Sequence, residues 1–211
     1  MSRRLDDLDL VAFMADGVHF GEHTCVVALG IGIDGTKYPL AVEEGSTENA
    51  TLVTGLITGL RERGLDVTKP ILAVIDGSKA LSRAINDVFD KPLIHRCQAH
   101  KIRNVRDRLP EKMRTVAEKR MRQAYHASSA IEAEGLLTAL ARELDRTHPG
   151  AAASLREGMA ETLTILRLGV PPTLARTLHS TNPIESMIEI CREHSKNVKV
   201  RRGKRWEFER R

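Results

Sequence analysis

The sequence predicts an α/β protein in which helices flank a mixed β-sheet and an all-helical insertion precedes the last helix of the sheet domain. Three observations support this class. Five apolar runs of strand length lie within the first 95 residues, helical patterns separate the later runs, and residues 111 to 178 show helical periodicity without a strand signal. With 211 residues, 41% of them hydrophobic, the chain can bury a core in one large domain or two small ones.

The first three apolar runs predict an antiparallel group. They span residues 10–16, 23–33 and 36–42. The dipeptide Asp34-Gly35 between the second and third runs is a strong signal for a two-residue hairpin. Pro39 in the third run indicates an edge strand, because proline has no backbone N–H to donate to a neighbouring strand.

The chain then alternates between helix and strand, which predicts β-α-β units and completes a mixed sheet. The expected helices cover residues 47–63, 78–88 and 97–109, and the expected strands cover residues 70–76 and 92–95. Ser46 or Thr47 is expected to cap the first helix, with Gly64 after its end, and Ser78 is expected to cap the second. Pro110 ends the third helix.

These elements predict four segments. Residues 1–110 form the first part of the sheet domain, 111–178 the helical insertion, 179–200 the helix that completes the sheet domain, and 201–211 a basic tail.

Composition argues against several classes of protein. The three cysteines are an odd number and widely spaced, which argues against a disulfide framework and for the reducing cytoplasm. No apolar run follows the basic N-terminus and no uncharged apolar stretch reaches 18 residues, so we expect neither a signal peptide nor a membrane span. Only 3% of residues are aromatic, which argues against stacking platforms for single-stranded nucleic acid.

Positive charge is concentrated in two blocks. The net charge is +5, but residues 96–122 hold ten Lys and Arg against three acids, and residues 192–211 hold nine against three. Two basic blocks on an acidic body predict a polyanion partner. The alternative is a pair of solvated helix faces, and the acidic motifs that the blocks flank favour nucleic acid.

Two predicted buried strands each end in an aspartate followed by glycine, at Asp16 and Asp76. If the two strands are parallel neighbours, their carboxyl ends bring these aspartates side by side. Closely packed carboxylates repel each other unless a cation lies between them, and Mg²⁺ prefers carboxylate oxygens, water and phosphate. The alternative is that each aspartate is a turn residue, since Asp-Gly is common in turns.

Two roles are open for Glu185. Asn182 at the N-cap and Pro183 at the first helical position would put Glu185 at the third, where its carboxylate can fold back to the cap. Turned outward, it would be the third carboxylate of a two-metal site for phosphodiester chemistry. We expect the outward orientation.

Several segments carry a family pattern. They are ADGVHF (15–20), GLRERGL with VIDGSKAL (59–65 and 74–81), HRCQAHKIRNV (95–105) and STNPIESMI (180–188). Together they resemble the Mutator-like DDE transposases of bacterial insertion sequences, over roughly residues 10–200. The resemblance implies a ribonuclease H-like fold and metal-dependent DNA strand cleavage and strand transfer in transposition.

The resemblance also implies roles for individual residues. Asp16, Asp76 and Glu185 would be the catalytic carboxylates and would hold two Mg²⁺ or Mn²⁺ ions. The partner would be DNA, both insertion-sequence ends and target, bound by a homo-oligomer. The residues expected to bind DNA are Arg96, Cys97, His100, Lys101, Arg103, Arg192, Lys196 and Lys199.

The Cys97–His100 pair has two other interpretations. A Cys-x-x-His pair is half of a zinc site, but no second pair with ligand spacing is visible, and His95, Cys191 and His194 would have to join through the fold. In the structural interpretation Cys97 is buried under the sheet and His100 is hydrogen-bonded.

Both ends depart from the family pattern. Only 15 residues precede Asp16, and the basic segment after the last helix stops at residue 211. We therefore expect a truncated copy. Two alternative functions stay open: an inactive DNA-binding remnant of a transposase, and a ribonuclease H-like nuclease that acts on other nucleic acid.

Overall fold

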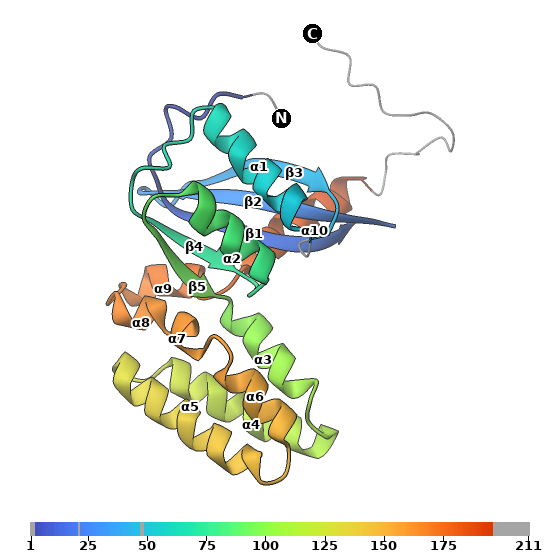
Figure 1. Cartoon of the computed structure of the whole chain (residues 1–211), viewed down its shortest axis with the longest axis vertical. Helices are drawn as coiled ribbons and strands as arrows, with labels where there is room; N and C mark the ends of the chain where they lie inside the picture. The colour runs from blue at the N-terminus through green and yellow to red at the C-terminus, as the bar shows by residue number, and fades with distance from the viewer. Residues whose placement is uncertain (1–2, 21, 47–48, 196–211) are drawn as a thin grey trace.

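A computed structural model of the chain describes residues 3–20, 22–46 and 49–195. Its strands are β1 (Leu10–Phe20), β2 (His23–Gly32), β3 (Lys37–Glu44), β4 (Ile71–Ile75) and β5 (Pro92–Arg96). They form one mixed sheet in the order β3-β2-β1-β4-β5, with helices on both faces (Figure 1). The predicted mixed α/β class is confirmed.

β1 lies at the centre and joins the two halves of the sheet. It pairs antiparallel with β2 and parallel with β4, while β3 and β5 form the edges. The parallel ladder between β1 and β4 ends at the pair Ala15–Ile75, so Asp16 and Asp76 follow directly after it. The two aspartate strands are therefore parallel neighbours, which was the condition for bringing Asp16 and Asp76 together. Pro39 lies in the edge strand β3, as predicted.

Several strand ends differ from the prediction, notably the end of β1 and the connection between β2 and β3. β1 does not end at Asp16 but continues to Phe20, because this segment keeps pairing with β2. The connection between β2 and β3 covers residues 33–36 and is not a two-residue turn. In this connection the Asp34 carboxylate accepts hydrogen bonds from the N–H and the hydroxyl of Thr36.

The helices follow the predicted order. Those before the insertion are α1 (Ala50–Glu62), α2 (Lys79–Val88) and α3 (Gln98–Arg106). The next six are α4 (Glu111–Tyr125), α5 (Ala130–Asp145), α6 (Pro149–Arg156), α7 (Met159–Thr162), α8 (Thr164–Arg167) and α9 (Pro172–Leu178), and α10 (Asn182–Ser195) comes last. Residues 111–178, all of them described, contain helices and no strand, as predicted.

Cap residues decide where two helices begin. α1 begins later than predicted, because Asn49 is its N-cap and accepts the N–H of Leu52 at 3.2 Å. Asn and Ser are about equally good N-cap residues, so residue preference does not choose between them, and the structure places the cap at Asn49 and not at the predicted Ser46. Thr47 lies outside the described residues. Ser78 caps α2 as predicted.

Two apolar layers cover the sheet. α1 and α2 pack on one face, and α10 contributes Ile184 and Ile188 to the layer on the other. Successive side chains of a strand point to opposite faces, so Phe13 lies in the first layer and Met14 in the second. Asp16 follows Met14 by two residues and therefore points to the face that α10 covers.

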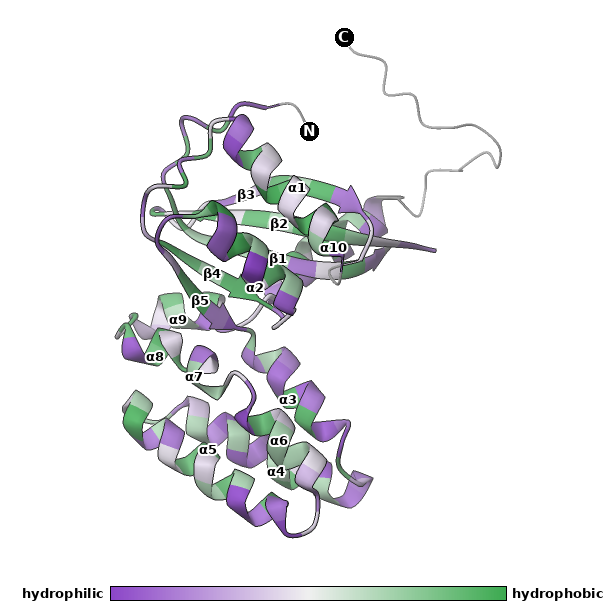
Figure 2. Ribbon diagram, viewed as in Figure 1, coloured by the Kyte–Doolittle hydropathy of each residue, from purple (hydrophilic) through white to green (hydrophobic). Residues whose placement is uncertain are grey.

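The insertion has a core of its own, in which Met121 and Leu137 are fully buried. Its helices carry alternating hydrophobic and hydrophilic stripes, as expected for amphipathic packing (Figure 2). α3 joins this core through Ile102 and Val105. In packing, α3 thus belongs with the helices of the insertion, although the predicted segment 1–110 includes it.

Proline and glycine lie at two of the breaks between helices of the insertion, at residues 148–150 before α6 and 169–172 before α9. Between α6 and α7, Gly158 has a φ of 62°, in the left-handed region that glycine tolerates. None of the helices in the described ranges is long and apolar enough to cross a membrane.

Candidate active site

Asp16 is an acid buried within the protein, with 2% of its surface exposed. Burial raises the pKa of Asp16 to about 6, because a low-dielectric environment disfavours the charged form. The positive charge of His100 and a hydrogen bond from Thr181 oppose this shift. The negative charges of Asp76 and Glu185 add to it. A cation at this point would relieve both the burial and the repulsion.

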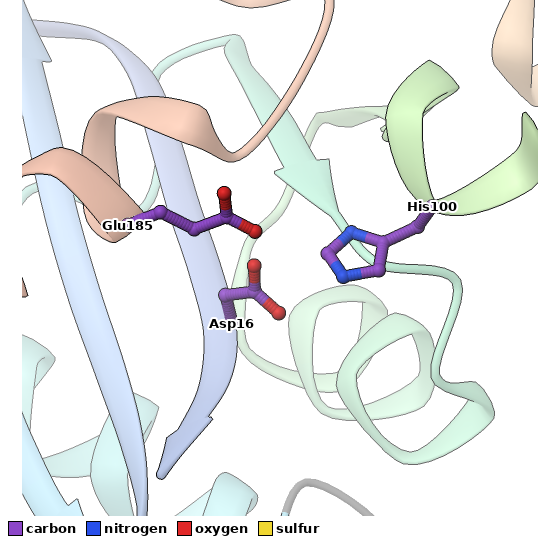
Figure 3. A group of neighbouring side chains, drawn as sticks. All are labelled: Asp16, His100 and Glu185. Atoms are coloured by element: carbon purple, nitrogen blue, oxygen red, sulfur yellow. The ribbon is translucent and has the colours of Figure 1, made fainter. Parts of the chain in front are cut away.

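Glu185 lies on α10, and its carboxylate points toward the carboxylate of Asp16 on β1 (Figure 3). One ligand atom each from Asp16, Glu185 and His100 lies within 4.8 Å of the others. We call these three residues the site cluster. They come from β1, α10 and α3, so the fold assembles the cluster from three distant parts of the chain.

The start of α10 bears on the capping role that was open for Glu185. The helix begins at Asn182, and the carbonyl of Thr181 accepts the N–H groups of Ile184 and Glu185. Asn182 is thus already helical, which shifts the predicted cap by one residue, and Glu185 is no longer at the third position that a capping box requires. Its carboxylate points toward Asp16, which is the outward orientation we predicted.

Asp76 is not part of the site cluster. Its Oδ1 accepts the N–H of Ser78 at 2.7 Å, so the turn role that the sequence left open is real. Asp76 is nevertheless close enough for its negative charge to raise the pKa of Asp16. A carboxylate also has a second oxygen that can bind a cation. In the site cluster, the third residue beside Asp16 and Glu185 is thus His100 and not Asp76.

The Cys-x-x-His spacing is a helix cap. Cys97 is the fully buried N-cap of α3, and its Sγ accepts the N–H of His100 at 3.5 Å. Burial raises the pKa of Cys97, but hydrogen bonds and positive charge from His100 outweigh it and lower the pKa overall. A side-chain hydrogen bond with Cys97 raises the pKa of His100 to about 9, against the effect of burial. His100 is therefore a cation at neutral pH, beside Asp16.

Thr181 links the parts of the site and was not predicted. It is fully buried directly before α10, and its Oγ1 lies 3.4 Å from His100 Nδ1 and 3.6 Å from Cys97 Sγ. Its side chain also hydrogen-bonds Asp16. Thr181 lies inside the STNPIESMI segment, but nothing local to that segment indicates its partners, which are 81 to 165 residues away.

Arg96 and Lys101, predicted to bind DNA, are 6% and 2% exposed. The ammonium of Lys101 donates to the carbonyls of Ser154 at 2.8 Å and Glu157 at 2.5 Å. Arg96 donates to the carbonyls of Gly77 at 3.0 Å and Glu157 at 3.2 Å. The predicted DNA-binding role is therefore wrong for both residues, because both are buried and donate to backbone carbonyls inside the protein.

The other basic residues predicted to bind DNA differ in position. Arg103 is exposed, and its charge lowers the pKa of His100, so it lies near the site cluster. Arg192 is exposed on α10 and donates to a backbone carbonyl of β1. Lys196 and Lys199 lie outside the described residues. DNA contact by Arg103 and Arg192 stays a prediction.

Residues that a zinc site would need do not converge. The site cluster contains His100 but not Cys97, whose sulfur serves as the helix cap. His95 is fully buried, with its Nε2 3.4 Å from the carbonyl oxygen of His179, while Cys191 and His194 are exposed on α10. Within the described part of the chain, the site cluster is the one group of three or more potential ligands that meets.

Comparison with known proteins identifies relatives. The model of the family described as "Transposase, Mutator family" matches residues 10–202. The chain is 29% identical over 204 residues to the transposase for insertion sequence element IS6120 of Mycolicibacterium smegmatis, covering 94% of this chain and 62% of that protein. It is 27% identical over 174 residues to the transposase for IST2 of Acidithiobacillus ferrooxidans, covering 82% and 58%.

A third relative is the transposase for insertion sequence element ISRM5 of Rhizobium meliloti (strain 1021), 29% identical over 175 residues, which cover 83% of this chain and 43% of that protein. The chain thus spans less than two thirds of the length of these relatives. Because the family match extends over most of its residues, the chain belongs to the Mutator family of transposases.

Proposed function

We propose that the chain is the catalytic core of an insertion-sequence transposase, which cleaves DNA strands and joins them to new sites with the help of divalent metal ions. The observation that carries the proposal is the convergence of Asp16 and Glu185 within 4.8 Å, beside Asp76. Membership of the Mutator family of transposases supports this reaction class. The order β3-β2-β1-β4-β5 of the mixed sheet supports a ribonuclease H-like core.

The donor atoms suit the proposed metals. Mg²⁺ and Mn²⁺ bind carboxylate oxygens, and Asp16 and Glu185 present them to a common point. Burial and the neighbouring acids disfavour the charge of Asp16 until a cation compensates it. Asp76 would bring a further oxygen for the second ion, since its bond to Ser78 uses only Oδ1.

The residues of the chain then have distinct roles. Two bound ions would activate the attacking hydroxyl or water and stabilise the leaving oxygen of the phosphodiester. Asp16, Glu185 and Asp76 would hold those ions in place. His100, which is positively charged, would donate a hydrogen bond to a phosphate oxygen, and Cys97 and Thr181 would orient its ring. Strand cleavage and strand transfer would use the same site, because both displace an oxygen at phosphorus.

We further propose that the partner is DNA and that the protein acts in the cytoplasm as a homo-oligomer on DNA. Exposed Arg103 and Arg192 would contact phosphates without reading sequence. Recognition of insertion-sequence ends and of target DNA belongs to the same proposal.

The test is metal-dependent nicking of DNA that contains insertion-sequence ends, with the Asp76→Asn variant alongside the wild type. We expect nicking that requires Mg²⁺ or Mn²⁺ and disappears in Asp76→Asn. Retained nicking in the variant would refute the assignment. An RNA–DNA hybrid serves as competing substrate: preferred cleavage of the hybrid would indicate a nuclease. Salt-sensitive DNA binding with no metal binding and no nicking would indicate an inactive remnant.

A further inference from the structure

The turn at Glu157 and Gly158 in the insertion docks against the turn that follows Asp76. Arg96 joins the two: it donates to the carbonyl of Gly77 at 3.0 Å and to the carbonyl of Glu157 at 3.2 Å. Lys101 adds a second bond to the Glu157 carbonyl. Both cations are buried, so these hydrogen bonds form away from competing water.

Both turns are shaped around the guanidinium of Arg96. Gly77 and Gly158 have φ values of 103° and 62°, which disfavour any residue with a Cβ. A Cβ at either position would also overlap the guanidinium of Arg96. The guanidinium therefore lies directly against the backbone of each turn, one from the sheet domain and one from the insertion.

An arginine is suited to this place because its planar fork can donate to two acceptors in different directions, which a single ammonium does less well. The Glu157 carboxylate also lies 3.4 Å from Arg96, but its side chain is 53% exposed. Such an ion pair is screened by solvent and contributes little. The two backbone carbonyls therefore account for the link.

The link acts one residue from Asp76. Arg96 pairs with Ile75 in the parallel ladder of β5 and β4, and its guanidinium holds the carbonyl of Gly77. Asp76 lies between these two points, and its carboxylate accepts the N–H of Ser78. A change in the Gly77 turn would therefore move the Asp76 carboxylate.

We propose that Arg96 is a positioning residue that couples the helical insertion to the active site. By holding the Gly77 turn against the Glu157–Gly158 turn, it sets where the Asp76 carboxylate lies relative to Asp16. The catalytic consequence rests on the proposed function, whereas the positioning itself does not.

The first test uses glycine variants with a matched control. Gly158 and Gly169 have nearly equal φ values, 62° and 61°, but an added Cβ overlaps Arg96 only at Gly158 and meets nothing within 4 Å at Gly169. Gly158→Ala and Gly169→Ala therefore share the backbone strain and differ in the overlap. In an Arg96→Ala background the overlap is removed, and the two glycine variants should then behave alike.

The readout is amide hydrogen exchange of the 211-residue chain. The amide of Ser78 reports on the Asp76 turn, and the amide of Val74 in the central sheet reports on global opening. We expect Arg96→Ala and Gly158→Ala to accelerate Ser78 exchange about tenfold while Val74 stays within about twofold of wild type. Gly169→Ala should leave both unchanged.

Two exchange results would overturn the proposal. One is Ser78 exchange in Arg96→Ala that matches the wild type or that rises only in parallel with Val74. The other is a Gly158→Ala variant that behaves like Gly169→Ala when Arg96 is present.

The second readout is DNA nicking. A misplaced Asp76 should raise the Mg²⁺ concentration for half-maximal nicking about tenfold in Arg96→Ala, with recovery at saturating metal and an unchanged KM for DNA. A raised KM for DNA with unchanged metal dependence would mean that Arg96 contacts DNA, and would also overturn the proposal. If the wild type does not nick DNA, the proposed function fails, and the exchange results still decide whether Arg96 positions the turn.

Discussion

Replacing Asp16 with Asn tests whether the site holds a strained carboxylate. The pKa of Asp16 is raised from 3.8 to about 6 in the folded protein. A raised pKa means that the ionised form is less favourable in the folded state than in the unfolded state. The contribution of Asp16 to the free energy of unfolding is therefore fully present below about pH 4 and is lost as the pH rises through 6. Asn carries no charge, so Asp16→Asn does not suffer this loss.

The magnitude follows from the pKa difference of about 2 units. At about 1.36 kcal/mol per unit, the free energy of unfolding of the variant, relative to wild type, should rise by about 2–3 kcal/mol between pH 4 and pH 7. Solvent screens the Asp16 carboxylate little, because only 2% of the residue is exposed, so this free-energy difference is not reduced further. His100, with a pKa of about 9, stays charged in the wild type throughout this range and adds little to the change.

The assay is urea unfolding in metal-free buffer at pH 4, 5, 6 and 7, with the exposed Asp90→Asn as control. The control should show a nearly constant difference from wild type. Adding Mg²⁺ at pH 7 should stabilise the wild type and leave Asp16→Asn unaffected, because a ligand stabilises the state that binds it. A difference between Asp16→Asn and wild type that is flat, or falls with pH, would refute the reasoning.

Three further predictions concern the helices. Cys97→Ala removes the side-chain hydrogen bond that most raises the pKa of His100, so this pKa should fall from about 9 toward its ordinary range in an NMR titration; an unchanged value would contradict the side-chain interaction between Cys97 and His100. Asn49→Ala should lower the free energy of unfolding by about 1 kcal/mol through loss of the α1 cap, and Asn49→Ser should restore most of it. Leu137→Ala should cost about 2–5 kcal/mol in urea unfolding, because the residue is fully buried in the core of the insertion; a smaller cost would mean that this core is loosely packed.

Local pattern was sufficient for much of the fold. The apolar runs of β1 and β4, the cap at Ser78 and the helical character of residues 111–178 all follow from side chains within a few positions of one another. The sequence could bring Asp16 and Asp76 together only on the condition that their strands are parallel neighbours, and the pairing of β1 with β4 meets this condition. Boundaries were harder, as Asn49 and the extension of β1 to Phe20 show, because competing caps and pairing partners decide them.

The sequence by itself determined the mixed α/β class, the helical character of residues 111–178 and the resemblance to the family, because each follows from local pattern or motif. Only the tertiary structure decided which groups meet Asp16 and which cations are available to a partner. Arg96 and Lys101 look like surface charges in a basic block, yet carbonyls of residues 154 and 157 take up their donors. Such burial depends on how the end of β5 and the start of α3 lie against the end of α6, 53 to 61 residues away, and periodicity along the chain carries no information about contacts at that range.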